Sequence, residues 1–254
     1  MAEPLVLSGS SLNTFLRCPR QWEYAYVYRL KRPPSLKQQL GISAHEAVEL
    51  DLKQKVVTRT DLPVEELTEK FRDSFVPAAL EAAENPKRGE TRGSMLDSGV
   101  KAVGHWRKVV APTYQPAMVE QHVQFAINGI PIDGTIDTVD EDDIIVDHKF
   151  VGKRPSSGEM YILNMTGYGV GFRRLTGRIE GGIRLDHIVR NKEPDYVPIR
   201  SDGPIPDDAI VAYAGIVQDV RDSIMAGIFP PHGLKSNACS WCGYNDICPA
   251  YRKE

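Results

Sequence analysis

A change of hydrophobic period in the middle of the chain constrains the fold most. Before residue 111, apolar residues recur every three or four positions, as they do on amphipathic helices. Over residues 119–125 they alternate instead, which predicts a strand, and an Asn-Gly turn leads to a return strand over residues 131–139. A third, more apolar strand is expected over residues 144–150. Helices therefore precede a three-stranded meander.

The remaining sequence adds helices at residues 159–175 and 206–225 and a strand within residues 179–190. This order predicts an α/β fold with a small mixed sheet flanked by helices. The chain has 254 residues, of which 41% are hydrophobic, enough for one domain over residues 1–254. Within that domain we expect a helical insert at 57–115 and a cysteine-rich tail at 232–254.

Charge and hydropathy exclude several classes of protein. The net charge is −3, so any nucleic-acid site must be a local basic patch. No apolar run is long enough to span a bilayer, and the first residues lack the basic and apolar regions of a signal peptide. We therefore expect a cytoplasmic protein with no membrane contact.

Acidic residues lie on adjoining strands of the expected meander. Asp133 and Asp137 share one face of the second strand, and Asp147 and Lys149 share one face of the third. Since consecutive strands usually pair, Asp137 and Asp147 can approach each other. Two facing carboxylates repel unless a cation lies between them, and Mg²⁺ or Mn²⁺ prefers such oxygen ligands. The alternatives are solvated hairpin residues, or Asp133 in the place of Asp137.

The four cysteines form a second constellation. Cys18 lies near one end, and Cys239-x2-Cys242-x5-Cys248-Pro lies near the other. If all four bind one centre, the two ends must meet. Four thiolates suit either a tetrahedral zinc ion or a [4Fe–4S] cluster, and the spacing alone does not decide between these two.

Several of these motifs together resemble a known family. Gly134-Thr-Ile-Asp137 followed by Ile145-Val-Asp147-His148-Lys149 resembles the core motif of the PD-(D/E)XK nucleases, in particular the RecB-like branch. That branch has a Gly-x3-His-x3-Glu helix upstream, matched by Gly41, His45 and Glu49, and a Gln-x3-Tyr helix downstream, matched by Asn164 and Tyr168 with Asn in place of Gln. The resemblance implies a restriction-endonuclease-like core.

The resemblance also implies roles for these residues. It makes His45, Asp137, Asp147 and the backbone carbonyl of His148 the ligands of Mg²⁺ or Mn²⁺, Lys149 the catalytic lysine, and Tyr168 a residue that places the DNA strand. The implied reaction is metal-assisted hydrolysis of a phosphodiester bond.

The cysteines extend the resemblance. An N-terminal Cys-Pro with the C-terminal cysteine motif is similar to iron–sulfur RecB-like nucleases: the CRISPR-associated exonucleases of the Cas-four family, the AddB nuclease domain and phage exonucleases. This implies a structural [4Fe–4S] cluster on Cys18, Cys239, Cys242 and Cys248 that joins the two ends. It further implies an exonuclease acting 5′ to 3′ on DNA ends or single strands, in recombination, repair or CRISPR spacer processing with partner proteins. The alternative is a non-catalytic DNA-binding adaptor subunit of such a complex.

Residues near Tyr168 are candidate DNA contacts. Arg173 and Arg174 follow it on the same expected helix, and with Asn164 they form the predicted DNA-binding set. A solvated helix face is the alternative reading of these arginines. The aromatic residues at positions 22, 24, 26 and 28 either stack on bases or pack around Cys18 and the core, and we expect packing.

Overall fold

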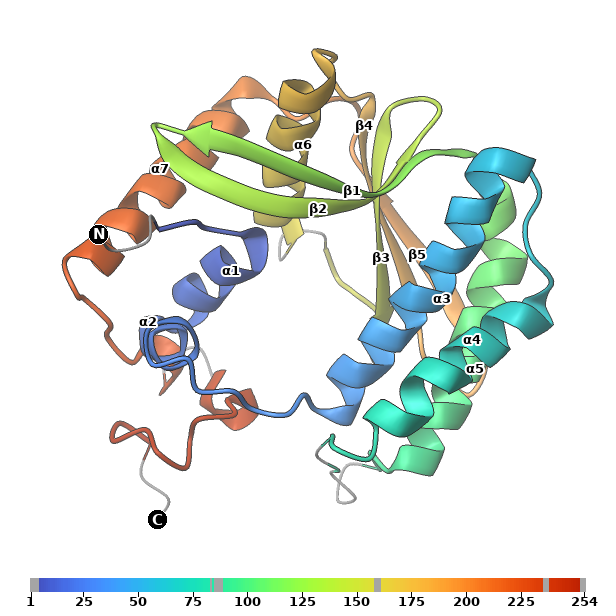
Figure 1. The fold of residues 1–254 in the computed structure, drawn as a ribbon, viewed down its shortest axis with the longest axis horizontal. Coiled ribbons are helices and arrows are strands. Elements are labelled where there is room, and N and C mark those ends of the chain that lie inside the picture. Colours follow the sequence, from blue (N-terminus) through green and yellow to red (C-terminus); the bar gives the residue numbers. More distant parts are fainter. Residues whose placement is uncertain (1–4, 83, 85–88, 158–160, 235–237, 252–254) are drawn as a thin grey trace.

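A five-stranded mixed sheet forms the centre of the fold (Figure 1). This computed structural model describes residues 5–82, 84, 89–157, 161–234 and 238–251. The strands are β1 (Pro116–Ile127), β2 (Ile130–Asp140), β3 (Ile144–Val151), β4 (Gly182–Val189) and β5 (Asp195–Arg200), in that spatial order. The β3–β4 pair is parallel and the other pairs are antiparallel. The expected α/β architecture is confirmed.

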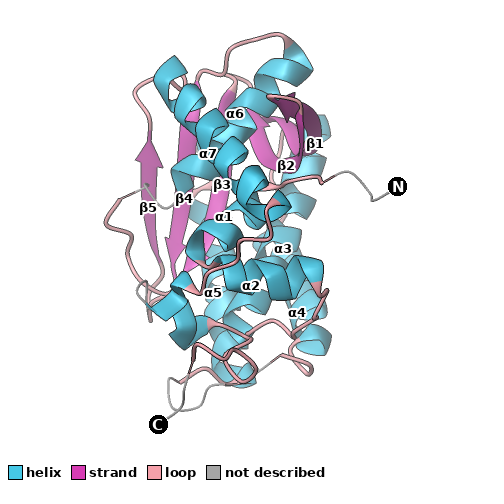
Figure 2. Ribbon diagram, turned by 90° about the vertical axis from the view of Figure 1, so that its left-hand side faces the viewer, coloured by secondary structure: helices cyan, strands magenta, loops and turns pink. Residues whose placement is uncertain are grey.

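Helices cover both faces of the sheet (Figure 2). They are α1 (Gly9–Arg17), α2 (Pro19–Trp22), a π-helical turn (Glu23–Val27), α3 (Leu36–Thr58), α4 (Val64–Ala78), α5 (Arg92–Val109), α6 (Ile162–Thr176) and α7 (Asp207–Met225). Short 3₁₀ turns occur at Ala111–Thr113, His232–Leu234 and Ala238–Trp241. Among the described residues, no helix has the length and apolar character that a membrane span requires.

The sequence determines where α3 begins and ends. Ser35 caps the first turn, with Gln38 completing a reciprocal capping box, and Arg59 ends the helix in the left-handed conformation at φ 61°. Helices α4 and α5, which account for most of the expected helical insert, pack on α3 through a core that includes Phe71, Phe75 and Trp106. The insert therefore supports the helix that carries His45.

Helix α6 makes the connection between the parallel strands β3 and β4 and packs on the opposite face of the sheet. Met165 and Phe172 of α6 pack against Ile145 of β3 and Leu185 of β4. On β3, Asp147 and Lys149 therefore share the face of Ile145, towards α6, because side chains alternate along a strand.

The N-terminal segment is tied to the tip of the β1–β2 hairpin. The Leu7 N–H donates to the Pro131 carbonyl over 3.0 Å, and the Asp133 N–H donates to the Leu7 carbonyl over 2.8 Å. This parallel bridge occupies the edge of β2 where β3 does not reach, and places α1 beside α6 and α7.

Candidate active site

The site is centred on the paired strands β2 and β3. Thr138 pairs with Val146 in antiparallel register, so the next residue on each strand, Asp137 and Asp147, lie beside each other. Lys149 lies two residues beyond Asp147 on the same face, and its Nζ donates to Asp147 Oδ1 over 2.7 Å. Two carboxylates and one ammonium group are thus concentrated at one point of the sheet.

His45 reaches this point from α3. Its Nδ1 lies 3.4 Å from Asp137 Oδ2, and its ring meets Phe150 edge-on with centroids 6.2 Å apart. Burial and the nearby Lys149 lower the pKa of His45, although Asp147 and the His148 backbone oppose the shift. A lowered pKa favours the neutral imidazole, which is the form that binds metals.

The charges of the site shift the pKa values of Asp137 and Lys149. Burial and the charge of Asp147 raise the pKa of Asp137 well above its ordinary value, against the opposing effect of Lys149. Burial by itself would lower the pKa of Lys149, but the Asp147 and Asp137 carboxylates outweigh it, so this pKa is raised. Lys149 is therefore a stable cation that compensates the negative charge of the pair.

The donor atoms at this point fit a hard divalent cation. Asp137 Oδ2 is buried and accepts no hydrogen bond, and an uncompensated carboxylate oxygen is costly unless a cation meets it. Within the part of the chain that the structure describes, however, no group of three His, Cys, Asp or Glu side chains is already gathered around one metal position. The Lys149 ammonium, 2.7 Å from Asp147 Oδ2 as well, neutralises that carboxylate instead.

Tyr168 of α6 lies next to the acidic pair. A Cβ on Gly134 would lie 3.8 Å from Tyr168 Cε1, so the motif glycine and the tyrosine are neighbours across the α6–sheet interface. Burial, followed by the charges of Asp137 and Asp147, raises the pKa of Tyr168. Its hydroxyl therefore stays protonated and can donate a hydrogen bond.

Asn164 lies one helical turn before Tyr168 and contacts another helix. Its Oδ1 accepts a 2.7 Å hydrogen bond from Asn13 Nδ2 of α1. A Cβ on Gly9 would lie 2.7 Å from the same oxygen, so α1 approaches α6 closely here. The structure thus shows Asn164 joining α1 to α6, while its predicted DNA contact stays a prediction.

Three other sequence candidates lie apart from the acidic pair. Asp133, the competitor of Asp137, accepts hydrogen bonds from His122 at 2.9 Å and Gln124 at 2.8 Å near the hairpin tip. Arg173 binds Glu180 through two hydrogen bonds of 2.8 and 2.7 Å, whereas Arg174 is exposed. Of the two candidate aspartates on β2, Asp133 and Asp137, it is Asp137 that lies beside Asp147.

Sequence reasoning missed two residues of the site. The Lys149 Nζ lies 5.5 Å from the ring centre of Tyr161, a residue that precedes α6. Glu120 of β1 adopts a left-handed backbone at φ 49°, and its charge acts on both Asp137 and Tyr168. No spacing pattern indicates either residue, because each reaches the site only through the tertiary fold.

The side chain of His148 points away from Asp147, into the buried layer beneath α5. Its Nδ1 accepts from Trp106 Nε1 at 3.3 Å, and its Nε2 is 3.0 Å from the Tyr114 hydroxyl. Burial lowers the pKa of His148 well below its ordinary value, so the ring is neutral. These contacts fix the strand that carries Asp147 and Lys149.

The four cysteines come together from the two ends of the chain. Cys18, Cys239, Cys242 and Cys248 line one cavity, and all four are free thiols. Burial and then the proximity of Cys18 and Cys248 raise the pKa of Cys239. Four thiols around one cavity are a donor set that fits a metal centre, although they are not closed into a ligand shell.

Comparisons with known proteins identify the family and the fold. The family model of the PD-(D/E)XK nuclease superfamily matches residues 6–249. A solved structure described as "Putative exonuclease" from Eubacterium rectale aligns with a TM-score of 0.63 and 12% identity over 98% of this chain and 90% of that chain. The structure of SSO0001 aligns over 100% of this chain and 90% of its own at 15% identity and a TM-score of 0.47. No curated protein matches significantly.

The family match extends over nearly the whole chain and includes every motif residue of the acidic site. By fold and family, the protein is thus a nuclease. It belongs to the PD-(D/E)XK nuclease superfamily.

Proposed function

We propose that this protein is a metal-dependent deoxyribonuclease that degrades DNA from its ends or as single strands. The juxtaposition of Asp137, Asp147 and Lys149, with one buried carboxylate oxygen left without a donor, is the observation that carries the proposal. Such an arrangement suits hydrolysis of a phosphodiester, in which negative charge develops at a phosphate next to a metal.

The proposed ligands of Mg²⁺ or Mn²⁺ are the side chains of Asp137, Asp147 and His45 together with the His148 carbonyl. The metal would polarise the phosphate and lower the pKa of a bound water. Lys149 would hold the attacking water and neutralise charge that develops on the phosphate. Tyr168, protonated and beside the carboxylates, would donate a hydrogen bond to the DNA strand.

We also propose that the cysteine cavity holds a [4Fe–4S] cluster on Cys18, Cys239, Cys242 and Cys248. The convergence of these four residues from distant parts of the sequence supports the assignment, and zinc is the competing occupant. A cluster at this place would join the N- and C-terminal segments and leave the chemistry to the acidic site.

By its resemblance to iron–sulfur RecB-like nucleases, the proposed activity runs 5′ to 3′ in the cytoplasm. It would serve recombination, repair or CRISPR spacer processing together with partner proteins of those pathways. Arg174 and Asn164 stay proposed DNA contacts on the helix that carries Tyr168, whereas the guanidinium of Arg173 is already bound to Glu180.

The test compares end-labelled linear and circular single-stranded DNA with Mg²⁺ or Mn²⁺. Lys149→Ala and Asp147→Ala should each lower the rate by at least about 10²-fold, because each removes charge stabilisation at the reacting phosphate. Lys153→Ala, which removes an exposed lysine outside the site, is the matched control and should retain full activity. Melting temperatures and iron content verify that each variant is folded.

If the protein digests linear DNA but not circular DNA, the result supports an exonuclease. If it also cuts circular DNA, the proposal that it needs a DNA end is overturned. A folded wild-type protein with its metal centre intact that cuts no DNA overturns the enzyme proposal. In that case the DNA-binding adaptor becomes the assigned function.

A further inference from the structure

Two tyrosines near the N-terminus are exposed in a way that the other aromatic residues are not. Tyr26 is 42% exposed and Tyr28 is 56% exposed. Every other Phe, Tyr or Trp side chain that the structure describes is buried or half-buried. The neighbouring Trp22 and Tyr24 pack in the interior, as expected from the sequence, so the four aromatic residues divide into two inner and two outer ones.

Tyr26 is the outer member of a stack of three rings. The Trp22 ring lies nearly parallel to that of Phe229, at 12° with centroids 5.8 Å apart, and the Tyr26 ring lies on Trp22 at 20° and 5.1 Å. The two inner rings hold the tyrosine in place. The Tyr26 ring therefore offers a flat surface that is already oriented, so a ligand that stacks on it loses little side-chain entropy on binding.

Tyr28 is held by different contacts. Its hydroxyl donates to Glu23 Oε1 over 3.2 Å, and Glu23 is paired with Arg20. The ring of Tyr28 also lies against that of Tyr24 with centroids 6.2 Å apart. Both exposed rings are thus fixed by buried partners rather than free to rotate into the core.

The backbone that presents these rings is unusual. Residues Glu23–Val27 form a π-helical turn, and Arg29 adopts a left-handed conformation at φ 53°. Both features are uncommon and cost stability, and π-helical turns in particular are frequent at functional sites. The sequence pattern predicts an ordinary helix here, so the deviation is specific to the fold.

The charge around the two rings is positive. Arg29 and Lys31 are exposed directly after Tyr28, and Arg32 follows, paired with Asp246. The acidic Glu23 is buried in its pair with Arg20. A fixed aromatic surface bordered by cations matches the chemistry of single-stranded nucleic acid, whose bases stack and whose phosphates are negative.

We propose that Tyr26 and Tyr28 are a stacking platform for the unpaired bases of a single DNA strand, with Arg29 and Lys31 contacting its phosphates. The inference rests on the proposed nuclease function and specifies which form of DNA the protein holds. A short loop joins this segment to Ser35, the cap of α3, which is the helix that carries His45. The proposed platform is therefore linked directly to an element of the active site.

The test is the binding of a fluorescent single-stranded oligothymidylate without added Mg²⁺ or Mn²⁺. Tyr26→Ala and Tyr28→Ala should each weaken binding by roughly tenfold, since each removes one base–aromatic stack. Tyr26→Phe and Tyr28→Phe keep the rings and should stay within about twofold of the wild type. Val57→Ala, at an 81% exposed apolar residue of α3, is the control and should change nothing.

A blunt duplex of the same length is a second control. Because its bases are paired and cannot stack on the tyrosines, the wild type and all variants should bind it with equal affinity. Wild-type affinity in both alanine variants would overturn the platform, as would an equal loss in the Phe variants. Since binding is measured without cleavage, loss of the platform and loss of the nuclease proposal give separate results. A wild-type protein that binds the single strand in a Tyr26-dependent manner but cuts no DNA refutes only the latter.

Discussion

Arg173 and Arg174 are adjacent on α6, but their surroundings differ. Arg173 uses its guanidinium to bind the buried Glu180 and to donate to the Ile205 carbonyl over 2.7 Å. Burial would raise the pKa of Glu180, but the hydrogen bond from Arg173 and that from the Ile205 N–H lower it instead. Arg173 is therefore part of the fold, and Arg174 is the arginine whose side chain is available at the surface.

This difference predicts opposite effects of two neighbouring substitutions. Arg173→Ala should destabilise the protein by about 3 kcal/mol, because it leaves a buried carboxylate without its partner. Arg174→Ala should leave stability within about 0.5 kcal/mol and weaken DNA binding in a salt-dependent way. Urea unfolding and DNA binding measured on both variants test this, and equal stabilities would contradict it.

At this scale, spacing identifies residues that act within one strand or helix. Asp147 and Lys149 could be predicted because a strand places them on one face, and Asp137 because the next strand pairs beside them. The Arg173–Glu180 pair crosses from α6 to the loop that follows it, and the Asn13–Asn164 pair joins helices far apart in sequence. Such pairs depend on helix packing, which no local pattern records.

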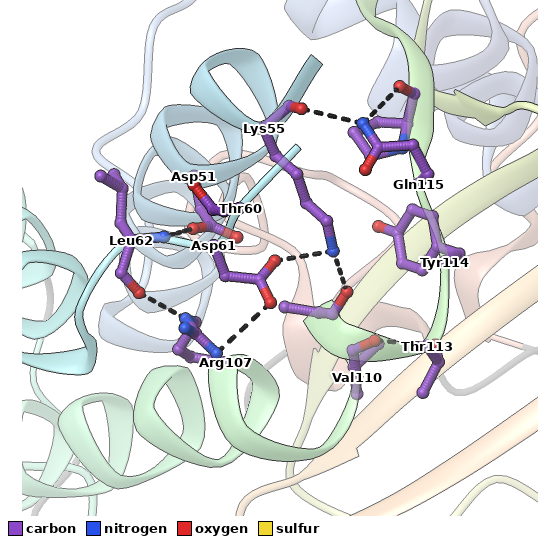
Figure 3. A network of polar contacts seen from close by, with 12 residues as sticks. Asp51, Lys55, Thr60, Asp61, Leu62, Arg107, Val110, Thr113, Tyr114 and Gln115 are labelled. Carbon is purple, nitrogen blue, oxygen red and sulfur yellow. Dashed lines mark hydrogen bonds and ion pairs between the residues drawn. The ribbon is translucent and has the colours of Figure 1, made fainter. Parts of the chain in front are cut away.

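The attachment of the helical insert to α3 depends on a buried polar network between elements (Figure 3). Lys55 Nζ contacts Asp61 Oδ1 at 2.7 Å and donates to the Ala111 carbonyl over 2.6 Å, while Arg107 of α5 lies 3.5 Å from the other oxygen of Asp61. Asp51 accepts from the Leu62 N–H over 2.6 Å, but its Oδ2 is buried without a partner. The network therefore includes one carboxylate that is incompletely satisfied.

Asp51 gives the network a predictable pH dependence. Burial raises the pKa of Asp51 to about 6, so the folded state binds this proton more tightly than the unfolded state does. Its contribution to stability is full at pH values below its ordinary pKa of 3.8 and is lost as the pH rises through 6.

Asp51→Asn, which keeps an oxygen for the Leu62 N–H, should remove this penalty. The free energy of unfolding of the variant should exceed that of the wild type by roughly 2–3 kcal/mol above pH 6, with the difference shrinking towards pH 4. Denaturation at several pH values measures it. A difference that does not change with pH would refute the role of Asp51.

The packing of α4 on α5 depends on a glycine at one position and not at another. A Cβ on Gly99 would lie 2.0 Å from Phe71 Cζ, whereas one on Gly104 would lie 3.5 Å from the nearest atom of Val64. Gly99→Ala should destabilise the protein by about 1–3 kcal/mol through overpacking. Gly104→Ala, on the same helix, should stabilise the protein by up to about 1 kcal/mol. Thermal unfolding of both variants beside the wild type tests these opposite effects.

Helices and strands with a clear hydrophobic periodicity could be predicted from the sequence, but the edge strand β5 could not. The sequence does not predict strand β5 (Asp195–Arg200) because it is short, contains Pro198 and has no fully buried residue, so its pattern resembles a loop. Its position depends on pairing with β4 instead. The start of the predicted helix at 159 lies outside the described residues, and α6 is seen from Ile162.

At the scale of the whole molecule, one short segment connects three separate regions. Leu7 pairs with β2, Asn13 binds Asn164 of α6, and Cys18 lines the cavity with the cysteines of the tail. Asp246, which lies between Cys242 and Cys248 in the sequence, pairs with Arg32. A centre on the cysteines would thus stabilise the contacts of α1 with both the sheet and α6.

Removal of one cysteine should therefore affect the whole fold. Cys18→Ser should abolish the iron content and visible absorption and cost about 3 kcal/mol, a drop in Tm of roughly 6–12 °C. If the four thiolates share one centre, as proposed, Cys18→Ser combined with Cys248→Ser should cost little more than either alone. Additive losses would contradict a shared centre, and stoichiometric zinc without visible absorption would replace the cluster.

The position of Cys18 also has a consequence for the order in which the protein matures. The ribosome makes Cys18 early, but the strand that Leu7 pairs with, the helix that Asn13 binds and the other three cysteines are all made later. The first helix therefore cannot complete its contacts until the segments that carry β2, α6 and the last cysteine have all been made. A centre on the four cysteines would form only after Cys248 has been made, and a nascent chain that is cut short before Cys248 could not complete it.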